Sequence, residues 1–90
     1  MFYTVYILRF SNNNLYIGQT NNLPQRLNDH KNKATRASKY SKENGEFKLV
    51  HEERYRTQLE VMRREKQLKG WTRAKKEALI AGNLELLKKL

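Results

Sequence analysis

The sequence predicts a small mixed fold of the α/β class, with strands and helices in separate segments (α+β). Three observations support this prediction: two short strand-like segments flank "SNNN", a third such segment lies near position 50, and helix signals occupy most of the rest. A chain of 90 residues has the length of one domain with one modest core. We therefore expect a single domain over residues 1–90.

The first two predicted elements form a β-hairpin. "FYTVYILRF" (2–10) is rich in β-branched and aromatic residues, "SNNN" supplies turn residues, and "LYIGQT" (15–20) is a second strand. Because side chains alternate between two faces, a turn of three or five unpaired residues places Leu8 opposite Tyr16. One face then carries Val5, Ile7, Leu15 and Ile17. The other carries Tyr6, Leu8, Tyr16 and Gly18, where the glycine would let a substrate backbone come close.

The remaining elements are predicted from their capping signals. A helix begins near residue 23, because "NNLP" offers an asparagine N-cap and a proline in the first turn. "EFKLVHEERY" (46–55) is typical of a third strand. "TQLE" (57–60) is a capping box for a helix that begins near 58 and ends near Gly70. A helix from about 73 to 81 stops at Gly82, and Asn83 caps a last short one.

The charge of the chain favours a polyanionic partner. Lys and Arg number 19 against 9 Asp and Glu, which gives a net charge of +10. Residues 31–42 carry five basic side chains and no acid, and "RREKQLKGWTRAKK" (63–76) sets seven around one glutamate. One such block is often only a solvated helix surface, but two of them favour nucleic acid, bound through its phosphates.

Other compositional features restrict the function classes. The chain has no cysteine, so it forms no disulfide and no thiolate metal site, which fits a reducing compartment. No apolar run approaches the roughly 18–20 residues that span a bilayer, and "MFYTVYILRF" does not resemble a secretion signal. We expect a cytoplasmic protein that does not contact membranes.

Five separated residues carry a family resemblance. Tyr6 closes "TVY", Tyr16 opens "YIG" after nine residues, Arg26 and His30 follow on one predicted helix, and Glu65 lies on a later one. This order resembles the GIY-YIG nucleases, and especially their small single-domain members, which have a helix like "REKQLKGW" here. The family includes homing endonucleases, some restriction enzymes and the incision subunit of nucleotide excision repair. In this chain the first motif lacks the glycine and isoleucine of the family name but keeps its tyrosine.

The resemblance implies a small three-stranded antiparallel sheet flanked by helices, and cleavage of a phosphodiester with one divalent cation, Mg²⁺ or Mn²⁺. Tyr6 would help to deprotonate the attacking water, although a phenol with a pKa of about 10 needs a nearby cation for that role. Tyr16 would orient the water or the phosphate. Arg26 suits bidentate phosphate contact, and His30, one helical turn later, would bond the phosphate or Tyr6. Taken singly, these residues could also be ordinary strand aromatics and helix-surface residues.

Glu65 is the predicted metal ligand. With Val61 and Leu68 it occupies one helix face, and a partly buried carboxylate needs a compensating charge. Mg²⁺ bound by one carboxylate, phosphate oxygens and waters would supply that charge. The alternative is an ion pair with Arg64 or Lys69. We find no second acid in a comparable position and expect one cation and no small-molecule cofactor.

Two functions remain open. The first is a metal-dependent endonuclease acting on DNA rather than RNA, selective for structure and linked to repair or recombination. The second is a basic nucleic-acid-binding module with the same fold and weak or no cleavage. A ribosome-associated structural protein would explain the charge but not Glu65. The residues expected to contact nucleic acid are Gly18, Lys31, Lys33, Arg36, Lys39, Tyr40, Lys66, Lys69, Lys75 and Lys76, with Asn83 as a further candidate that could equally be a helix cap. Nothing in the sequence predicts the oligomeric state.

Overall fold

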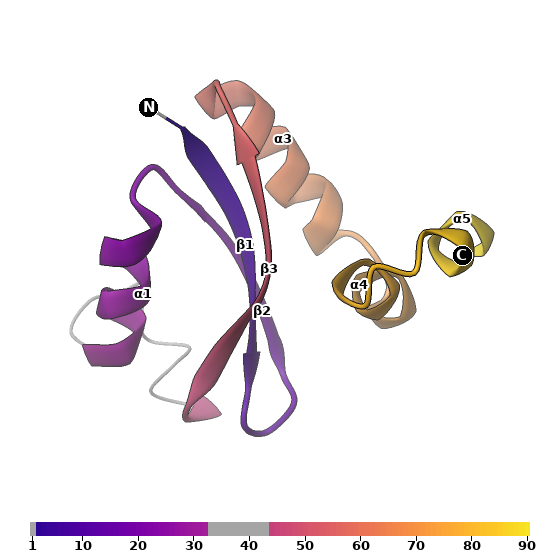
Figure 1. Cartoon of the computed structure of the whole chain (residues 1–90), viewed down its shortest axis with the longest axis horizontal. Coiled ribbons are helices and arrows are strands. Elements are labelled where there is room, and N and C mark those ends of the chain that lie inside the picture. The colour runs from indigo at the N-terminus through magenta and orange to yellow at the C-terminus, as the bar shows by residue number, and fades with distance from the viewer. Residues whose placement is uncertain (1, 33–43) are drawn as a thin grey trace.

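The fold is a three-stranded antiparallel sheet with helices on both faces, as predicted. A computed structural model describes residues 2–32 and 44–90. The strands are β1 (Tyr3–Phe10), β2 (Leu15–Thr20) and β3 (Phe47–Tyr55), in the order β2-β1-β3. In Figure 1, α1 lies on one side of the sheet and α3 on the other, with α4 and α5 beyond the end of α3. These helices are α1 (Leu23–Asn32), α3 (Gln58–Lys69), α4 (Arg73–Ile80) and α5 (Leu84–Lys89).

The hairpin has the predicted register. Leu8 pairs with Tyr16 and Arg9 with Leu15, so the turn leaves an odd number of residues between paired positions. The Phe10 amide donates to the Asn14 carbonyl at 2.9 Å, which closes the turn. Asn13 has a φ of 71°, a left-handed conformation that asparagine tolerates better than most residues. The same register places Tyr6 opposite Gly18.

Each face of the sheet has its own apolar cluster. On the α3 side, Val5, Ile7 and Ile17 pack against Val61 and Leu68. On the α1 side the cluster consists of Tyr6, Leu8 and Phe10, covered by Tyr16, Leu23, Leu27 and Phe47. The tyrosine face is therefore a second packed layer.

A bulge in β3 changes which of its residues face each layer. Ile7 pairs with His51 and Leu8 with Leu49, so Val50 is an extra residue in the strand. Before the bulge, Phe47 pairs with Phe10 and packs in the tyrosine layer. After it, Glu53 pairs with Val5 and lies on the α3 side.

The helix ends agree closely with their sequence signals. Asn22 caps α1 by accepting a hydrogen bond from the Gln25 amide at 3.1 Å, and Thr57 caps α3 by accepting from the Glu60 amide at 3.2 Å. α3 ends at Lys69, directly before Gly70, as expected. α4 ends at Ile80, one residue earlier than predicted, and Gly82 follows with a φ of 70°. Within residues 2–32 and 44–90, no helix has the length and apolar character needed to cross a membrane.

An ion-pair network connects α4 to the hairpin. Glu77 accepts hydrogen bonds from both terminal nitrogens of Arg9, one of them at 2.9 Å, and from Nε of Arg73 at 3.0 Å. Arg73 also donates to the Asn13 carbonyl at the turn. The hydrogen bonds from Arg9, followed by those from Arg73, lower the pKa of Glu77 to about 2. The carboxylate is therefore charged at neutral pH and attaches α4 to the hairpin.

Candidate active site

The centre of the site is Tyr6, whose ring occupies the space above Gly18. A Cβ atom placed on Gly18 would lie 2.6 Å from the Tyr6 hydroxyl oxygen, 2.7 Å from its Cζ and 3.0 Å from Cε1 of Tyr16. The two separations to Tyr6 are too short for non-bonded atoms, and the one to Tyr16 is tighter than most such contacts. Gly18 is buried, so the glycine serves the packing of the two tyrosines rather than the approach of a substrate, which corrects the sequence-based expectation.

Tyr6 is hydrogen-bonded to His30. Its hydroxyl lies 3.1 Å from Nε2 of His30, across from β1 to the last turn of α1. The His30 ring meets Tyr16 edge-on at 5.0 Å and Phe47 at 5.9 Å between centroids. Tyr6 and His30 are both 0% exposed. An aromatic cage therefore fixes the imidazole in one orientation. The sequence analysis expected His30 to bond either the phosphate or Tyr6, and the structure has the bond to Tyr6.

The site keeps both members of this pair neutral. Burial, followed by the proximity of Tyr16, raises the pKa of Tyr6 above its usual value, and the charge of Arg26 only partly opposes this. Burial, followed by the charge of Arg26, lowers the pKa of His30. A base role for Tyr6 would need its pKa to fall, whereas its surroundings have the opposite effect.

Arg26 and Tyr16 form the accessible side of this cluster. Both are partly exposed, whereas Tyr6 and His30 are not. Arg26 precedes His30 by one helical turn, and its charge influences the pKa of both Tyr6 and His30. The structure thus brings together four of the five predicted site residues, and the Arg26 and Tyr16 side chains are the two that reach the surface.

Glu65 lies on α3, against the opposite face of the sheet. An α-helix turns by about 100° per residue, so Arg64 and Glu65 flank the buried line of Val61 and Leu68 on opposite sides. Arg64 contacts β3, because its guanidinium binds Glu53 there. Since α3 packs across all three strands, Glu65 faces the other edge, formed by β2. Glu65 and Tyr16 therefore lie toward the same sheet edge from opposite faces.

The surroundings of Glu65 are compatible with a hard cation. Its side chain is 23% exposed, and in the described part of the chain its ionic partner is Lys69, with Nζ 3.6 Å from Oε1. That distance is too long for a hydrogen bond. Among residues 2–32 and 44–90 no three His, Cys, Asp or Glu side chains form a metal-binding group. A cation at Glu65 would thus need phosphate oxygens and waters as its other ligands, which Mg²⁺ readily accepts.

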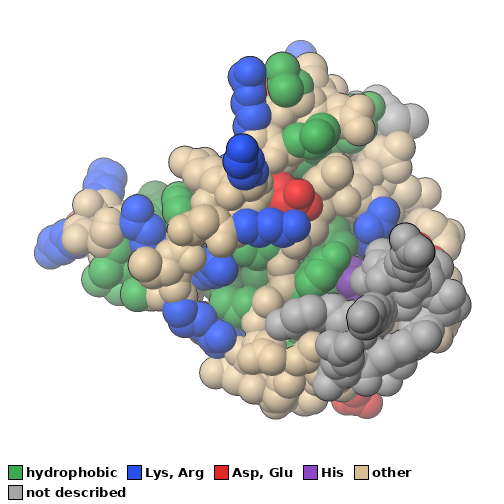
Figure 2. All heavy atoms as spheres, turned by 180° about the vertical axis from the view of Figure 1, so that it is seen from behind, with side chains coloured by type: hydrophobic (Ala, Val, Ile, Leu, Met, Phe, Trp, Pro, Cys, Tyr) green, Lys and Arg blue, Asp and Glu red, His purple; other side chains and the backbone are tan. Residues whose placement is uncertain are grey.

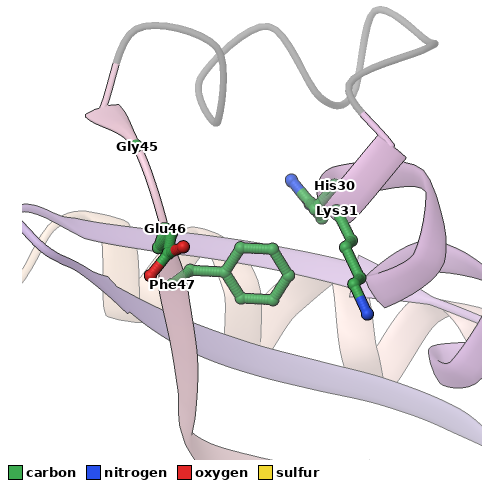
Figure 3. A pocket seen from close by; sticks show the side chains of 5 residues that line it. All are labelled: His30, Lys31, Gly45, Glu46 and Phe47. Atoms are coloured by element: carbon green, nitrogen blue, oxygen red, sulfur yellow. The ribbon is translucent and has the colours of Figure 1, made fainter.

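A hollow of about 540 Å³ opens beside His30, between the end of α1 and the start of β3. Figure 3 shows its lining, with the Phe47 ring extending from β3 toward His30 and Lys31. Gly45 and Glu46 complete the lining among the described residues. Lys31, one of the predicted phosphate contacts, is therefore at the rim of the aromatic cluster.

The other predicted contacts have different positions. Lys66 and Lys69 are exposed on α3, whereas Lys75 and Lys76 are partly exposed on α4. On the side of the molecule in Figure 2, Lys and Arg side chains surround a small acidic area. Asn83 caps α5 by accepting from the Leu86 amide at 3.1 Å, which is its structural alternative. Four predicted contacts lie outside the described residues: Lys33, Arg36, Lys39 and Tyr40.

One polar cluster was missed by the sequence analysis. Glu53 on β3 accepts hydrogen bonds from Tyr55 and from Arg64 and lies 2.7 Å from Nε2 of His51. These contacts, His51 first, hold the pKa of Glu53 far below its usual range against the effect of burial. Strand alternation alone could have grouped His51, Glu53 and Tyr55 on one face. Their partner on α3 has no sequence signal, because it depends on how the helix packs.

Comparison with known proteins supports the resemblance. The family model of the GIY-YIG catalytic domain matches residues 2–78. A UPF0213 protein of Syntrophus aciditrophicus is 42% identical over 81 residues, covering 90% of this chain and 92% of the relative. Another, from Natronomonas pharaonis, is 38% identical over 77 residues, covering 86% and 88%. The solution NMR structure of a UPF0213 protein from Bacillus halodurans is similar with a TM-score of 0.59 at 33% identity, covering 100% of this chain and 97% of that one. The chain belongs to the GIY-YIG catalytic domain family, a family of nucleases.

Proposed function

We propose that the protein is an endonuclease that hydrolyses phosphodiester bonds in DNA with one Mg²⁺ or Mn²⁺ ion. The observation that carries the proposal is the buried hydrogen bond between Tyr6 and His30, which Tyr16 on β2 and Arg26 on α1 adjoin. A module that only binds nucleic acid has no need of this arrangement. Glu65, facing the same edge, supplies the single carboxylate for the cation.

Arg26 and Tyr16 are the groups that we assign to the substrate. A guanidinium can donate two parallel hydrogen bonds to the scissile phosphate and stabilise the negative charge that develops on its oxygens. Arg26 is partly exposed and lies on the same helix as His30, whose ring is fixed by the aromatic cage. Tyr16 shares that cage, so its hydroxyl has a defined direction from which to orient a water molecule or a phosphate oxygen.

Tyr6 and His30 act in this proposal as positioning residues. The raised pKa of Tyr6 keeps the phenol protonated at neutral pH, so it can donate a hydrogen bond to a neutral His30 but is a poor base. A divalent cation held by Glu65 would lower the pKa of a coordinated water and so make its deprotonation easier. The proton of that water would then pass to solvent or to a phosphate oxygen of the substrate, since Tyr6 is a poor base.

The substrate is expected to be recognised by shape and backbone charge. The net charge of +10 favours contacts with phosphates that carry no sequence information. We therefore propose selection by DNA structure, such as branches or single strands, and a place in repair or recombination.

One observation favours the alternative, a binding module with weak or no cleavage. Tyr6 and His30 have no exposed surface, so in this conformation neither can touch a substrate directly. A module that binds without cutting would keep the fold and the basic surface but would not depend on Glu65.

Substitution of Glu65 separates the two functions. Supercoiled, single-stranded and branched DNA are incubated with wild type and Glu65→Gln, with and without Mg²⁺ or Mn²⁺. Because Glu65→Gln keeps the size of the side chain and removes its charge, cleavage should fall by a factor of order 10² or more. DNA affinity should stay level or rise, and the melting temperature should change little. Full metal-dependent cleavage by a folded Glu65→Gln protein would exclude Glu65 from the site.

A further inference from the structure

Arg64 directly precedes Glu65 in α3, and its side chain binds Glu53 on β3. Arg64 donates to Glu53 through Nε at 2.8 Å and through a terminal nitrogen at 3.1 Å, one bond to each carboxylate oxygen. This two-point geometry restricts both the distance and the orientation of the guanidinium. The contact joins the sheet to the helix one residue before Glu65.

The arginine is held on its other sides as well. Its remaining terminal nitrogen donates to Gln67 at 2.8 Å, and its guanidinium lies 5.1 Å from the centre of the Trp71 ring. Lys75 approaches the same ring at 5.4 Å. Contacts from β3, from α3 itself and from Trp71, two residues beyond the end of α3, therefore converge on one side chain.

Glu53 is equally well fixed on its own strand. His51 and Tyr55, two residues away on either side, each approach one of its oxygens at 2.7 Å. The position of the carboxylate is thus fixed by contacts within β3 alone. It can therefore fix the position of the Arg64 side chain on α3.

Glu65, by contrast, has little to fix its own direction. Lys69, its ionic partner in the described part of the chain, is 56% exposed, and the two side chains are 3.6 Å apart. Such an exposed pair one helical turn apart contributes little. The direction of Glu65 therefore depends on the rotation of α3 about its axis. The Val61 and Leu68 side chains pack α3 onto the sheet through apolar contacts, and such contacts lack the directionality of a two-point hydrogen bond.

We infer that Glu53 and Arg64 are positioning residues for Glu65: Glu53 fixes Arg64, and Arg64 fixes the rotation of α3 that directs the Glu65 carboxylate to the β2 edge. The inference rests on the proposed function, because it assumes that Glu65 is the cation ligand. Neither residue needs to touch the substrate or the cation. Residues that orient a metal ligand typically contribute a factor of 10 to 100 in metal affinity.

The test is a titration with Mn²⁺ alone, followed by the paramagnetic broadening of the amide NMR signals of residues 63–67. Glu65→Gln should remove the broadening. Glu53→Gln should weaken the apparent Mn²⁺ affinity by roughly tenfold, at the low end of the effect expected for an orienting residue. Arg64→Lys should do the same, because lysine keeps the charge but cannot make the two-point contact. The Arg64→Lys variant also tests the inference if the Glu53→Gln protein fails to fold.

Glu77→Gln is the matched control. Glu77 also accepts from two arginines, Arg9 and Arg73, and removing its charge changes the net charge of the protein by the same amount. Glu53→Gln and Glu77→Gln should both melt at lower temperature than wild type. Of these two variants, Glu53→Gln alone should change the Mn²⁺ titration. The inference is overturned if Glu53→Gln and Arg64→Lys bind Mn²⁺ like wild type, or if Glu77→Gln weakens binding equally. If Glu65→Gln leaves the broadening unchanged, Glu65 is not the Mn²⁺ ligand and the proposed function itself fails. That result is distinguishable from the two outcomes above, in which Glu65→Gln still removes the broadening.

Discussion

Replacing Gly18 by alanine should destabilise the protein strongly. In most strands this change is favourable, because alanine loses less conformational freedom on folding, by about 0.5–1 kcal/mol. Here the new Cβ would lie 2.6 Å from the Tyr6 hydroxyl oxygen and 2.7 Å from its Cζ. Tyr6 is fully buried and bonded to His30, so its ring cannot swing away without breaking other contacts. The sign of the effect therefore distinguishes this packing from an ordinary strand glycine.

The expected magnitude follows from two terms. Overpacking a core costs roughly 1–3 kcal/mol, and loss of the hydrogen bond between Tyr6 and His30 adds about 0.5–1.5 kcal/mol. After the backbone gain, about 0.5–4 kcal/mol remains, and its central value of about 2 kcal/mol lowers the melting temperature of a domain of this size by roughly 8–16 °C. Thermal unfolding followed by circular dichroism measures this directly. Gly70→Ala is the control, because a Cβ there meets its nearest atom at 3.5 Å and its φ of −82° suits any residue. A Gly18→Ala protein as stable as wild type would refute the packing argument.

Three further outcomes are expected. Tyr6→Phe removes the hydroxyl that bonds Nε2 of His30, so the free energy of unfolding in urea should fall by about 1–3 kcal/mol, and an unchanged value would mean that this hydrogen bond contributes nothing. Because the folded state lowers the pKa of His30, the unfolded chain binds the proton more readily, and stability should decline as the pH falls from about 6.5 toward the lowered pKa. Urea unfolding at several pH values measures this, and His30→Gln should lose that part of the pH dependence. Lys66→Ala with Lys76→Ala should weaken DNA binding for all sequences and reduce the slope of log affinity against log salt by about 2, whereas Lys88→Ala with Lys89→Ala, equal in charge, should not.

Much of the fold could be predicted from local signals. The hairpin register followed from alternation alone, because only an odd turn keeps Val5 and Ile7 on the face of Ile17. Asn22, Thr57 and Asn83 identified the helix starts, because each cap satisfies nearby backbone donors within the same segment. The caps depend on residues three positions apart and the hairpin on two strands joined by a short turn, so a sequence displays both directly.

The candidate site was predicted less completely. The five residues were found through resemblance, yet their order does not reveal that Glu65 lies on the other face of the sheet from His30. Nor could the burial of Tyr6 be foreseen, because it depends on α1 and on Phe47, which pack from distant parts of the chain. The Glu53–Arg64 contact spans 11 positions between a strand and a helix, and such pairs follow from tertiary packing alone.

The extra residue Val50 has a consequence for how β3 meets other molecules. β3 is an edge of the sheet, and an edge of nine residues presents unpaired backbone groups to which a strand from another chain could add. A bulge bends and twists the strand, so a partner strand cannot follow it with regular hydrogen bonds along its whole length. Exposed charges at Lys48, Glu52 and Arg54 add a further obstacle. The same local irregularity that assigns Phe47 and Glu53 to different layers thus makes this edge a poor template for aggregation.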